Sequence, residues 1–430
     1  MTQRPARPSI RTETLPCGIQ LATETMRDVA SVAVGFWVGT GSRDEPAPLA
    51  GASHFLEHLL FKGTPTRSAA AIAEALDEVG GDCNAYTTKE YTAFYVRLLA
   101  EDLTLGLDIL SEIMWDPALT PADVESERSV ILDEILMHAD EPSDLAAERW
   151  TAALFSGHPL GRDPLGTAQS VRATEAGDIR RFFEDHYRPK NMVVSVAGDC
   201  DHDQVAQAVE ARCTGAPGGQ APGRDAPQEP VQPLCIVHRT TEQAHLAFGA
   251  RSVSRFDESR WALAVLNHVL GGGLSSRLFQ KVREQRGLAY SIFSDRSSYQ
   301  DTGSLCVLAG TAPDYVDEVL RICAGELELL AESGVTDREL AVAKGNLRAE
   351  TLLACEDSGA RMSRIGASLL LHGEVWTVDE VLARIGGVER ADVQRAAEEL
   401  VAAPRSLSVV GPFEADAFDG AALGLAPTLA

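Results

Sequence analysis

Short apolar segments and longer amphipathic segments follow one another along the chain, and their order occurs twice. Apolar residues at every second position, or in short continuous runs, predict strands, whereas a period near 3.6 predicts helices. In the first half, strands are predicted from about Ile10 and at residues 19–25, 29–40, 83–89, 92–99 and 191–199. Helices are predicted around His54 and at residues 68–81, 102–114 and 120–138.

The second half repeats this order of strands and helices. Strands are predicted at residues 245–251, 287–297, 303–311 and 405–412, and helices at 259–271, 275–286, 313–332 and 336–354. The corresponding helices 120–138 and 336–354 each begin with a threonine suited to N-capping. Because the repeat is far longer than that of a solenoid, it indicates duplication of a whole domain.

The expected fold class is therefore α+β, with two duplicated domains related by pseudo-twofold symmetry. Each domain is expected to be a mainly antiparallel sheet packed with helices. Residues 214–233 are rich in Gly and Pro, which predicts a semi-rigid linker. This divides the 430 residues into domains 1–213 and 234–430, which suits a chain too long for one comfortable core.

The composition is that of a globular protein, with 45% hydrophobic residues. No run of eighteen apolar residues predicts a membrane span, and no apolar stretch follows the first arginines as a secretory signal requires. The eight cysteines are scattered, without a C-x-x-C pair. In a chain of this length they indicate buried, reduced thiols, so a cytoplasmic location is expected.

The net charge of −25 comes from 63 acidic against 38 basic side chains. It makes nucleic acid an improbable partner, because binding to phosphates needs a basic face. One interpretation of the charge is solubility. The other is an acidic interior that attracts basic, extended peptides by electrostatic focusing.

The segment His54-Phe55-Leu56-Glu57-His58 contains the clearest candidate chemistry. Two histidines four residues apart share one helix face, within reach of one metal ion, and imidazole suits zinc. Glu57 is placed to take a proton from a water activated by the metal. This is the H-x-x-E-H order, the inverse of H-E-x-x-H. The alternative is a structural histidine pair, which is the commoner role of two such residues.

A catalytic zinc normally has a third protein ligand. The candidates are Glu127 and Glu134, which lie seven residues apart on one face of the helix predicted at 120–138, whereas Asp133 points away from that face. One of the two glutamates would bind the metal and the other support it. Without the histidines they would equally fit a solvated helix face.

Four longer motifs carry a resemblance to a known family. They are SHFLEHLLFKGTPTR, NAYTTKEYTAFYV, ERSVILDEI and GGGLSSRLFQKVREQRGLAYSI. In order and over nearly the whole chain, they resemble the inverted-motif zinc peptidases of the pitrilysin and insulysin clan. The branch they resemble holds the mitochondrial processing peptidase β subunit and its bacterial single-chain relatives.

The resemblance implies a role for each residue. His54, His58 and Glu134 match the zinc ligands, with one Zn²⁺ per chain, and Glu57 matches the general base. Glu127 matches a second catalytic-site carboxylate that supports the metal. The family's extended substrate adds to a sheet edge, and the matching strand here includes Asn84 and Ala85.

The resemblance also assigns roles to the second half. Arg283 and Tyr290 match the residues that hold substrate near the scissile bond, where a tyrosine hydroxyl donates to the oxyanion. From the residues alone, Arg283 is a surface helix residue and Tyr290 a core aromatic. This half has no H-x-x-E-H, and His268 stands alone in the matching helix. It is therefore expected to position substrate rather than bind metal.

The resulting hypothesis is a zinc metalloendopeptidase that cleaves extended or unfolded peptides. If the acidic charge serves to attract substrate, these peptides are basic. Family members enclose a hollow with two such chains or one double-length chain. A homodimer, or a heterodimer with a homologous noncatalytic chain, is therefore expected. The rival from another class is a noncatalytic scaffold, since some relatives keep the fold and have lost ligands.

Overall fold

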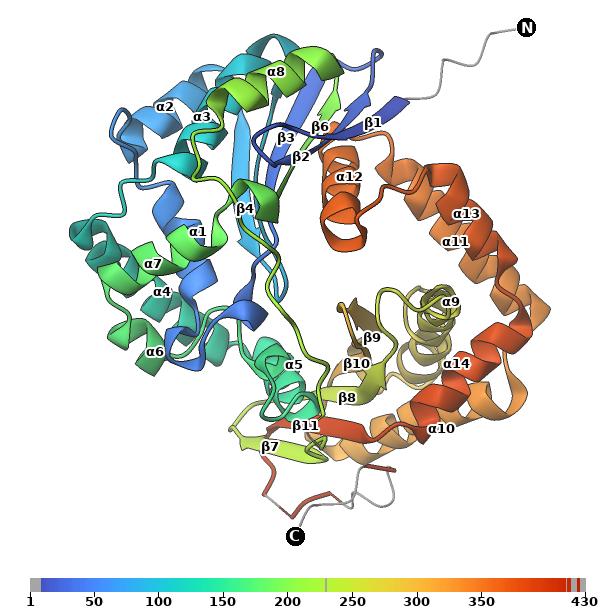
Figure 1. Ribbon diagram of the computed structural model, residues 1–430. Helices are drawn as coiled ribbons and strands as arrows, with labels where there is room; N and C mark the ends of the chain where they lie inside the picture. Colours follow the sequence, from blue (N-terminus) through green and yellow to red (C-terminus); the bar gives the residue numbers. More distant parts are fainter. Residues whose placement is uncertain (1–8, 229, 415, 419–423, 426–430) are drawn as a thin grey trace, which may run out of the picture. The chain divides into compact units, whose positions relative to one another are not determined.

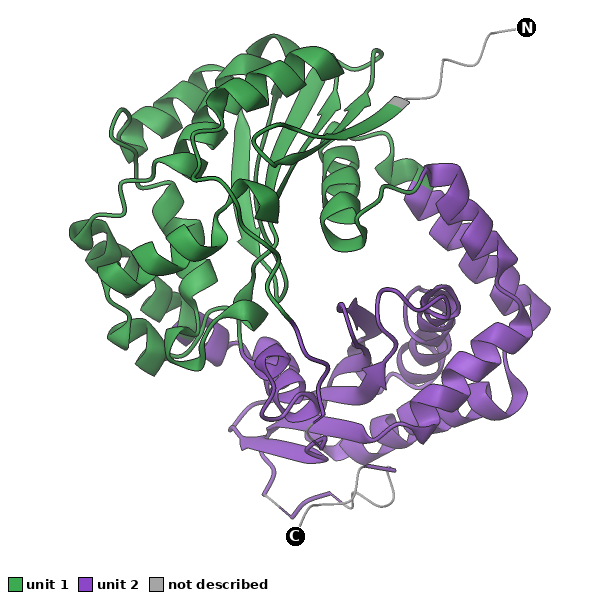
Figure 2. Ribbon diagram, viewed as in Figure 1, with its two compact units in different colours: residues 1–135, 163–223, 352–376 green, residues 136–162, 224–351, 377–430 purple. Residues whose placement is uncertain are grey.

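The computed structural model describes residues 9–228, 230–414, 416–418 and 424–425. The chain forms two compact units, each built on one sheet (Figure 1). Unit 1 comprises residues 1–135, 163–223 and 352–376, and unit 2 comprises residues 136–162, 224–351 and 377–430 (Figure 2).

The sheet of unit 1 has six strands in the order β1-β2-β6-β3-β5-β4. The strands are β1 (Ser9–Thr14), β2 (Gln20–Thr25), β3 (Ser31–Val38), β4 (Asp82–Thr87), β5 (Thr92–Leu99) and β6 (Met192–Gly198). Only β2 and β6 pair in parallel, and the other neighbours are antiparallel. The central strands β3 and β6 are almost wholly buried, which accounts for their continuous apolar sequence. The outer strand β4 is half-exposed.

Helices cover both faces of this sheet. Its helices are α1 (Ala52–Leu60), α2 (Ala69–Glu78), α3 (Leu103–Trp115), α4 (Pro121–Asp140), α6 (Ala168–Ala173), α7 (Ala176–His186), α8 (His202–Arg212) and α12 (Ser358–His372). The main core lies between one face and the helices that include α1, α3, α7 and α8. On the other face lies α12 (Figure 1). Its Met362, Ile365 and Leu369 belong to one buried cluster with Trp37.

The sheet of unit 2 has five strands in the order β7-β11-β8-β10-β9. They are β7 (Leu234–His238), β8 (Ala244–Ser252), β9 (Ala289–Ser298), β10 (Gly303–Thr311) and β11 (Arg405–Gly411). Its helices are α5 (Pro142–Leu154), α9 (Arg260–Leu270), α10 (Val316–Ser333), α11 (Asp337–Ala354), α13 (Val378–Gly387) and α14 (Arg390–Ala402). The main core lies under α9, α10 and α14, and α5 covers the opposite face.

The predicted duplication is confirmed by topology. In both sheets the last strand of the half, β6 or β11, lies between a parallel neighbour, β2 or β7, and an antiparallel neighbour, β3 or β8, which is the next strand along the chain. In both, a hairpin then leads to the edge strand, β4 or β9. The α+β class with two mainly antiparallel sheets follows directly from the pairings.

The two halves of the sequence exchange one helix each. α5 precedes the linker but packs on β8 and β11, where Trp150 Nε1 donates to the carbonyl of Ser406 at 3.1 Å. α12 follows the linker but packs on β2, β3 and β6. The compact units therefore differ from the continuous ranges 1–213 and 234–430. Their boundary at residues 223 and 224 still falls within the predicted linker, whose described residues form no helix or strand.

One predicted helix takes a different form. The segment 275–286 was expected to be α-helical, but Phe279–Glu284 forms a π-helix. Within it, the guanidinium of Arg283 lies over the ring of Phe279 at 4.8 Å. Among the described residues, no helix is long and apolar enough to span a membrane.

Candidate metal centre

α1 is held at its N-terminus by a buried carboxylate. Gly51 has φ 98°, and a side chain there would also meet the carbonyl of Leu165, so glycine suits the position. The two carboxylate oxygens of Glu45 accept hydrogen bonds from the backbone N–H groups of Gly51 and Ser53, both at 2.7 Å. This cap satisfies two backbone donors that a helix leaves open. It thereby fixes the start of the helix that carries H-x-x-E-H.

The spacing within α1 separates core residues from site residues. Phe55, Leu56, Leu59 and Leu60 are buried in the main core. The two histidines and Glu57 are half-buried, because positions 54, 57 and 58 share the remaining helix face. The rings of His54 and His58 lie edge to face with centroids 4.7 Å apart.

α4 brings two carboxylates to these histidines. Thr120 caps the helix, with its hydroxyl accepting from the N–H of Asp123 at 3.1 Å. Glu127 is 3% exposed and Glu134 is half-buried, whereas Asp133 is exposed, as expected from the spacing. The structure therefore brings both predicted glutamates to the same place.

Three ligand atoms converge on one point. Glu134 Oε2 lies 3.7 Å from His54 Nε2 and 3.5 Å from His58 Nε2. Two atoms that are each about 2.1 Å from a zinc ion at the tetrahedral angle lie about 3.4 Å apart. Glu134 Oε2 is also buried and accepts no hydrogen bond within the described structure. The donor set and its spacing therefore fit a zinc ion.

This group is the only one of its kind in the described part of the chain. No other set of three His, Cys, Asp or Glu side chains there has its ligand atoms within 4.8 Å of one another. His268, in the corresponding helix α9, is buried without such a set.

Glu127 contacts His58 through the ring nitrogen that does not face Glu134. Its Oε2 lies 3.0 Å from His58 Nδ1, and its Oε1 forms an ion pair with Lys62 Nζ at 2.5 Å. A carboxylate can only accept, so the shared hydrogen belongs to Nδ1 and the lone pair of Nε2 is left for a metal. The carboxylate of Glu127 thus acts through His58, not as a ligand.

Glu57 lies between the cluster and the edge strand β4. Its Oε2 accepts a hydrogen bond from Thr87 Oγ1 at 2.6 Å. Burial raises the pKa of Glu57, and the hydrogen bond from Thr87 partly opposes this rise. A carboxyl group with a raised pKa is suited to accepting and returning a proton.

The predicted substrate strand is an edge. Within the described sheet, β4 pairs only with β5, so its other side is open. Asn84 and Ala85 lie in the middle of β4, where the N–H of Ala85 donates to Asn84 Oδ1 at 2.8 Å. An open edge of this kind is what strand addition requires.

Arg283 and Tyr290 meet each other in unit 2. The guanidinium carbon of Arg283 lies 4.7 Å from the ring centroid of Tyr290. Tyr290 is 78% exposed, so it is not the core aromatic that its sequence alone indicates. The two residues form a cation–π pair, with Arg283 on the π-helix and the solvent-exposed Tyr290 on β9.

Two contacts of the site have no counterpart among the predicted residues. Lys62 lies just after the end of α1, so its nearness in sequence to His58 was the available signal. Thr87 reaches Glu57 from a strand thirty residues away, for which the sequence gives no local signal.

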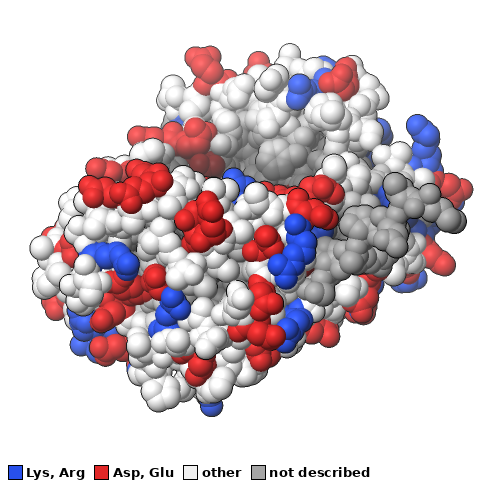
Figure 3. Space-filling model, turned by 90° about the horizontal axis from the view of Figure 1, so that it is seen from above, with Lys and Arg blue, Asp and Glu red and all other residues white. Residues whose placement is uncertain are grey.

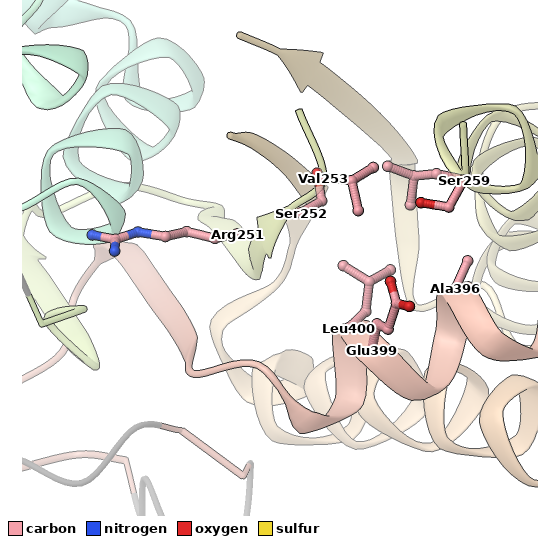
Figure 4. A pocket seen from close by; sticks show the side chains of 8 residues that line it. Arg251, Ser252, Val253, Ser259, Ala396, Glu399 and Leu400 are labelled. Atoms are coloured by element: carbon pink, nitrogen blue, oxygen red, sulfur yellow. The ribbon is translucent and has the colours of Figure 1, made fainter. Parts of the chain in front are cut away.

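A cavity of about 150 Å³ lies in unit 2 and contains none of the cluster residues. Its lining is mostly apolar. The guanidinium of Arg251 turns away from it (Figure 4) and lies over the ring of Phe155 at 5.3 Å. The lining residues are Arg251, Ser252, Val253, Ser259, Leu263, Ala396, Glu399 and Leu400. These residues supply no set of groups for metal chemistry.

Two family models match most of the chain. Residues 20–168 match "Insulinase (Peptidase family M16)", and residues 174–347 match "Peptidase M16 inactive domain". The first match contains all three candidate ligands.

Proteins of similar length are similar in sequence to nearly the whole chain. A Streptomyces coelicolor protein, named as an uncharacterized zinc protease, is 45% identical over 94% of this chain and 90% of its own length. A Mycobacterium tuberculosis protein with the same description is 44% identical over 94% and 93%. A protease from Helicobacter pylori has the same fold, with a TM-score of 0.87 at 23% identity over 95% of this chain and all of that chain.

Proposed function

The chain belongs to peptidase family M16, and we propose that it is a zinc metalloendopeptidase that cleaves extended or unfolded peptides. The proposal rests on the convergence of His54, His58 and Glu134 on one point. Glu134 Oε2 lies 3.7 Å from His54 Nε2 and 3.5 Å from His58 Nε2. The names of the zinc proteases that share nearly the whole chain support the choice of metal.

His54, His58 and Glu134 would hold one Zn²⁺ per chain. When bound, zinc lowers the pKa of water and polarises a carbonyl group. Glu57 is the proton carrier: its carboxylate takes the proton of the attacking water and delivers it to the leaving amine. Thr87 holds that carboxylate in place.

The substrate backbone is proposed to pair with the open edge of β4 at Asn84 and Ala85. Strand addition reads backbone groups, which only an extended or unfolded segment presents. Thr87 belongs to the same strand and contacts Glu57, so a peptide on this edge passes the general base. Arg283 and Tyr290 are proposed to hold the peptide, with the Tyr290 hydroxyl donating to the oxyanion.

We further propose a dimer that encloses a chamber, and a reducing, cytoplasmic location. All eight cysteines are free, which supports the location. Buried cysteines were expected, but Cys17, Cys83, Cys213 and Cys235 are partly exposed. Light scattering of the purified chain, against its mass of 46.0 kDa, tests the dimer.

The central test is Glu57→Gln. We expect this variant to bind zinc like the wild type and to lose at least about 100-fold in peptide cleavage, because the amide cannot take the proton. Zinc content and kcat/KM on a short basic peptide are the measurements. Glu74→Gln, an exposed glutamate of α2, is the matched control and should keep full activity. An active Glu57→Gln protein would overturn the mechanism.

The same assay separates the rival functions. A noncatalytic scaffold would bind no zinc and cleave nothing, although the complete ligand set argues against it. Cleavage by the purified single chain would exclude the need for a noncatalytic partner.

A further inference from the structure

We propose that Lys62 is a positioning residue for the metal, acting through Glu127 on His58. This inference rests on the proposed zinc function and concerns a residue that coordinates nothing itself. Its ammonium group fixes the buried carboxylate that sets the orientation of one ligand ring.

The contacts form a single chain of groups. Lys62 Nζ lies 2.5 Å from Glu127 Oε1, and the other oxygen of Glu127 lies 3.0 Å from His58 Nδ1. On the far side of the same ring, Nε2 faces Glu134 at 3.5 Å. Each oxygen of Glu127 therefore has one partner, and loss of either partner frees the carboxylate to turn.

Burial makes the ammonium group necessary. The side chain of Glu127 is 3% exposed, whereas that of Lys62 is 37% exposed. A buried carboxylate without a compensating charge is strongly disfavoured. Lys62 supplies that charge from the surface, and its stem crosses from the solvent to the site.

The backbone at Lys62 is itself held. Gly63 follows it with φ 125°, and the next turn is closed by the N–H of Thr64 donating to the carbonyl of Arg67 at 2.8 Å. Glu112 of α3 accepts hydrogen bonds from the side chains of Thr64, Thr66 and Arg67. The loop after α1 is thus tied to the core, and Lys62 has a fixed point from which to reach Glu127.

The test compares Lys62→Met with Lys62→Arg in zinc affinity, measured by competition with a chelator. Removing a group behind a ligating histidine typically costs about 10- to 100-fold in metal affinity. We expect a loss of this size for Lys62→Met and rescue to within about threefold for Lys62→Arg. The visible spectrum of the Co²⁺-loaded protein should change in Lys62→Met only. Wild-type affinity and an unchanged spectrum in Lys62→Met would overturn the inference.

Unit 2 offers a matched control. Lys281 forms an ion pair with Glu326, and the two side chains are 41% and 5% exposed, close to the values of Lys62 and Glu127. Lys281→Met removes a similarly buried pair far along the chain from the ligands, and Glu326 keeps Arg277 at 3.7 Å as Glu127 keeps His58. It should change thermal stability while leaving zinc affinity unaltered. An equal loss of zinc affinity in both lysine variants would show a general stability effect and contradict the proposal.

A double-mutant cycle with Glu127→Gln keeps the test decisive if Lys62→Met is unstable. When Lys62 acts through Glu127, adding Lys62→Met or Lys62→Arg to Glu127→Gln should cost no further affinity. Additive losses would overturn the coupling. Failure of the wild type to bind zinc would instead overturn the proposed function, so the two failures are distinguishable.

Discussion

Glu127 and Glu134 are two turns apart on α4, yet their surroundings assign them different chemistry. Glu127 is buried and has a partner on each oxygen, Lys62 Nζ and His58 Nδ1, and its contact with the imidazole is through Nδ1 and not through Nε2. Glu134 directs one buried oxygen at both Nε2 atoms and accepts no hydrogen bond there within the described structure. Identical side chains at equivalent helix positions thus become a ligand and a support.

This difference predicts the result of two neighbouring substitutions. Glu134→Gln should lower zinc affinity by more than about 100-fold, because a ligand outweighs the supporting groups whose loss costs 10- to 100-fold. Asp133→Asn, one residue away and exposed, should leave it unchanged. Chelator competition on the two purified variants checks both. Retained affinity in Glu134→Gln together with loss in Glu127→Gln would mean that the two roles are reversed.

At the residue scale, the sequence predicts the metal ligands better than the residues that contact and orient them. The one-turn spacing of His54 and His58 and the two-turn spacing of the glutamates are local, so periodicity alone brings each pair to one face. The choice between Glu127 and Glu134 needed either the family resemblance or the structure. Thr87 depends on the packing of β4 against α1, and no local pattern records such a contact.

At the scale of elements, helix α11 begins with the N-capping threonine that was predicted for it and for α4, and in α11 the cap is reciprocal. Thr336 Oγ1 accepts from the N–H of Glu339 at 3.2 Å, and Glu339 Oε2 accepts from the N–H of Thr336 at 2.7 Å. Arg277 Nε adds a bond to Glu339 Oε1 at 2.7 Å. Burial alone would raise the pKa of Glu339, but Arg277 and Thr336 outweigh it and lower the pKa to about 2.

The cap predicts a pH-dependent contribution to stability. An unfolded glutamate has a pKa of about 4.3. The folded pKa is lower, so the contribution is fully present well above the unfolded value and is lost as pH falls toward 2. Glu339→Gln should therefore lower the melting temperature by about 2–4 °C at pH 7, and by less at pH 4. Melting curves at both values test this. Glu332→Gln, an exposed glutamate nearby, is the control, and a pH-independent difference for Glu339→Gln would contradict the prediction.

Each predicted segment has a helix or strand as its counterpart, because these segments are strongly periodic, whereas helices α5 to α8 and α12 to α14 and strand β7 were not predicted. The exchange of α5 and α12 was not predicted either, since the face that a helix covers depends on distant partners. Met362 and Leu369 of α12 follow helical spacing, but nothing in that spacing names Trp37, more than three hundred residues earlier, as their partner. The π-helix was missed because a widened turn changes no residue pattern.

At the scale of the molecule, the net charge of −25 is the property that acts over the longest distance. Acidic side chains form several groups on the face shown in Figure 3, interspersed with fewer basic ones. Solubility and attraction of basic substrates both fit such a surface. The two interpretations differ in kinetics, because long-range attraction acts on association and is screened by salt.

Salt dependence of cleavage separates these interpretations. Two peptides of equal length with the same cleaved core and either lysine or glutamate flanks should respond in opposite ways. If the acidic field attracts substrate, kcat/KM for the lysine peptide should fall about tenfold as the Debye length shrinks from about 30 Å to about 3 Å. Over the same range, the value for the glutamate peptide should rise. The kcat at saturation should stay nearly constant for both, because screening alters encounter rather than chemistry. Equal salt responses of the two peptides would leave solubility as the role of the charge.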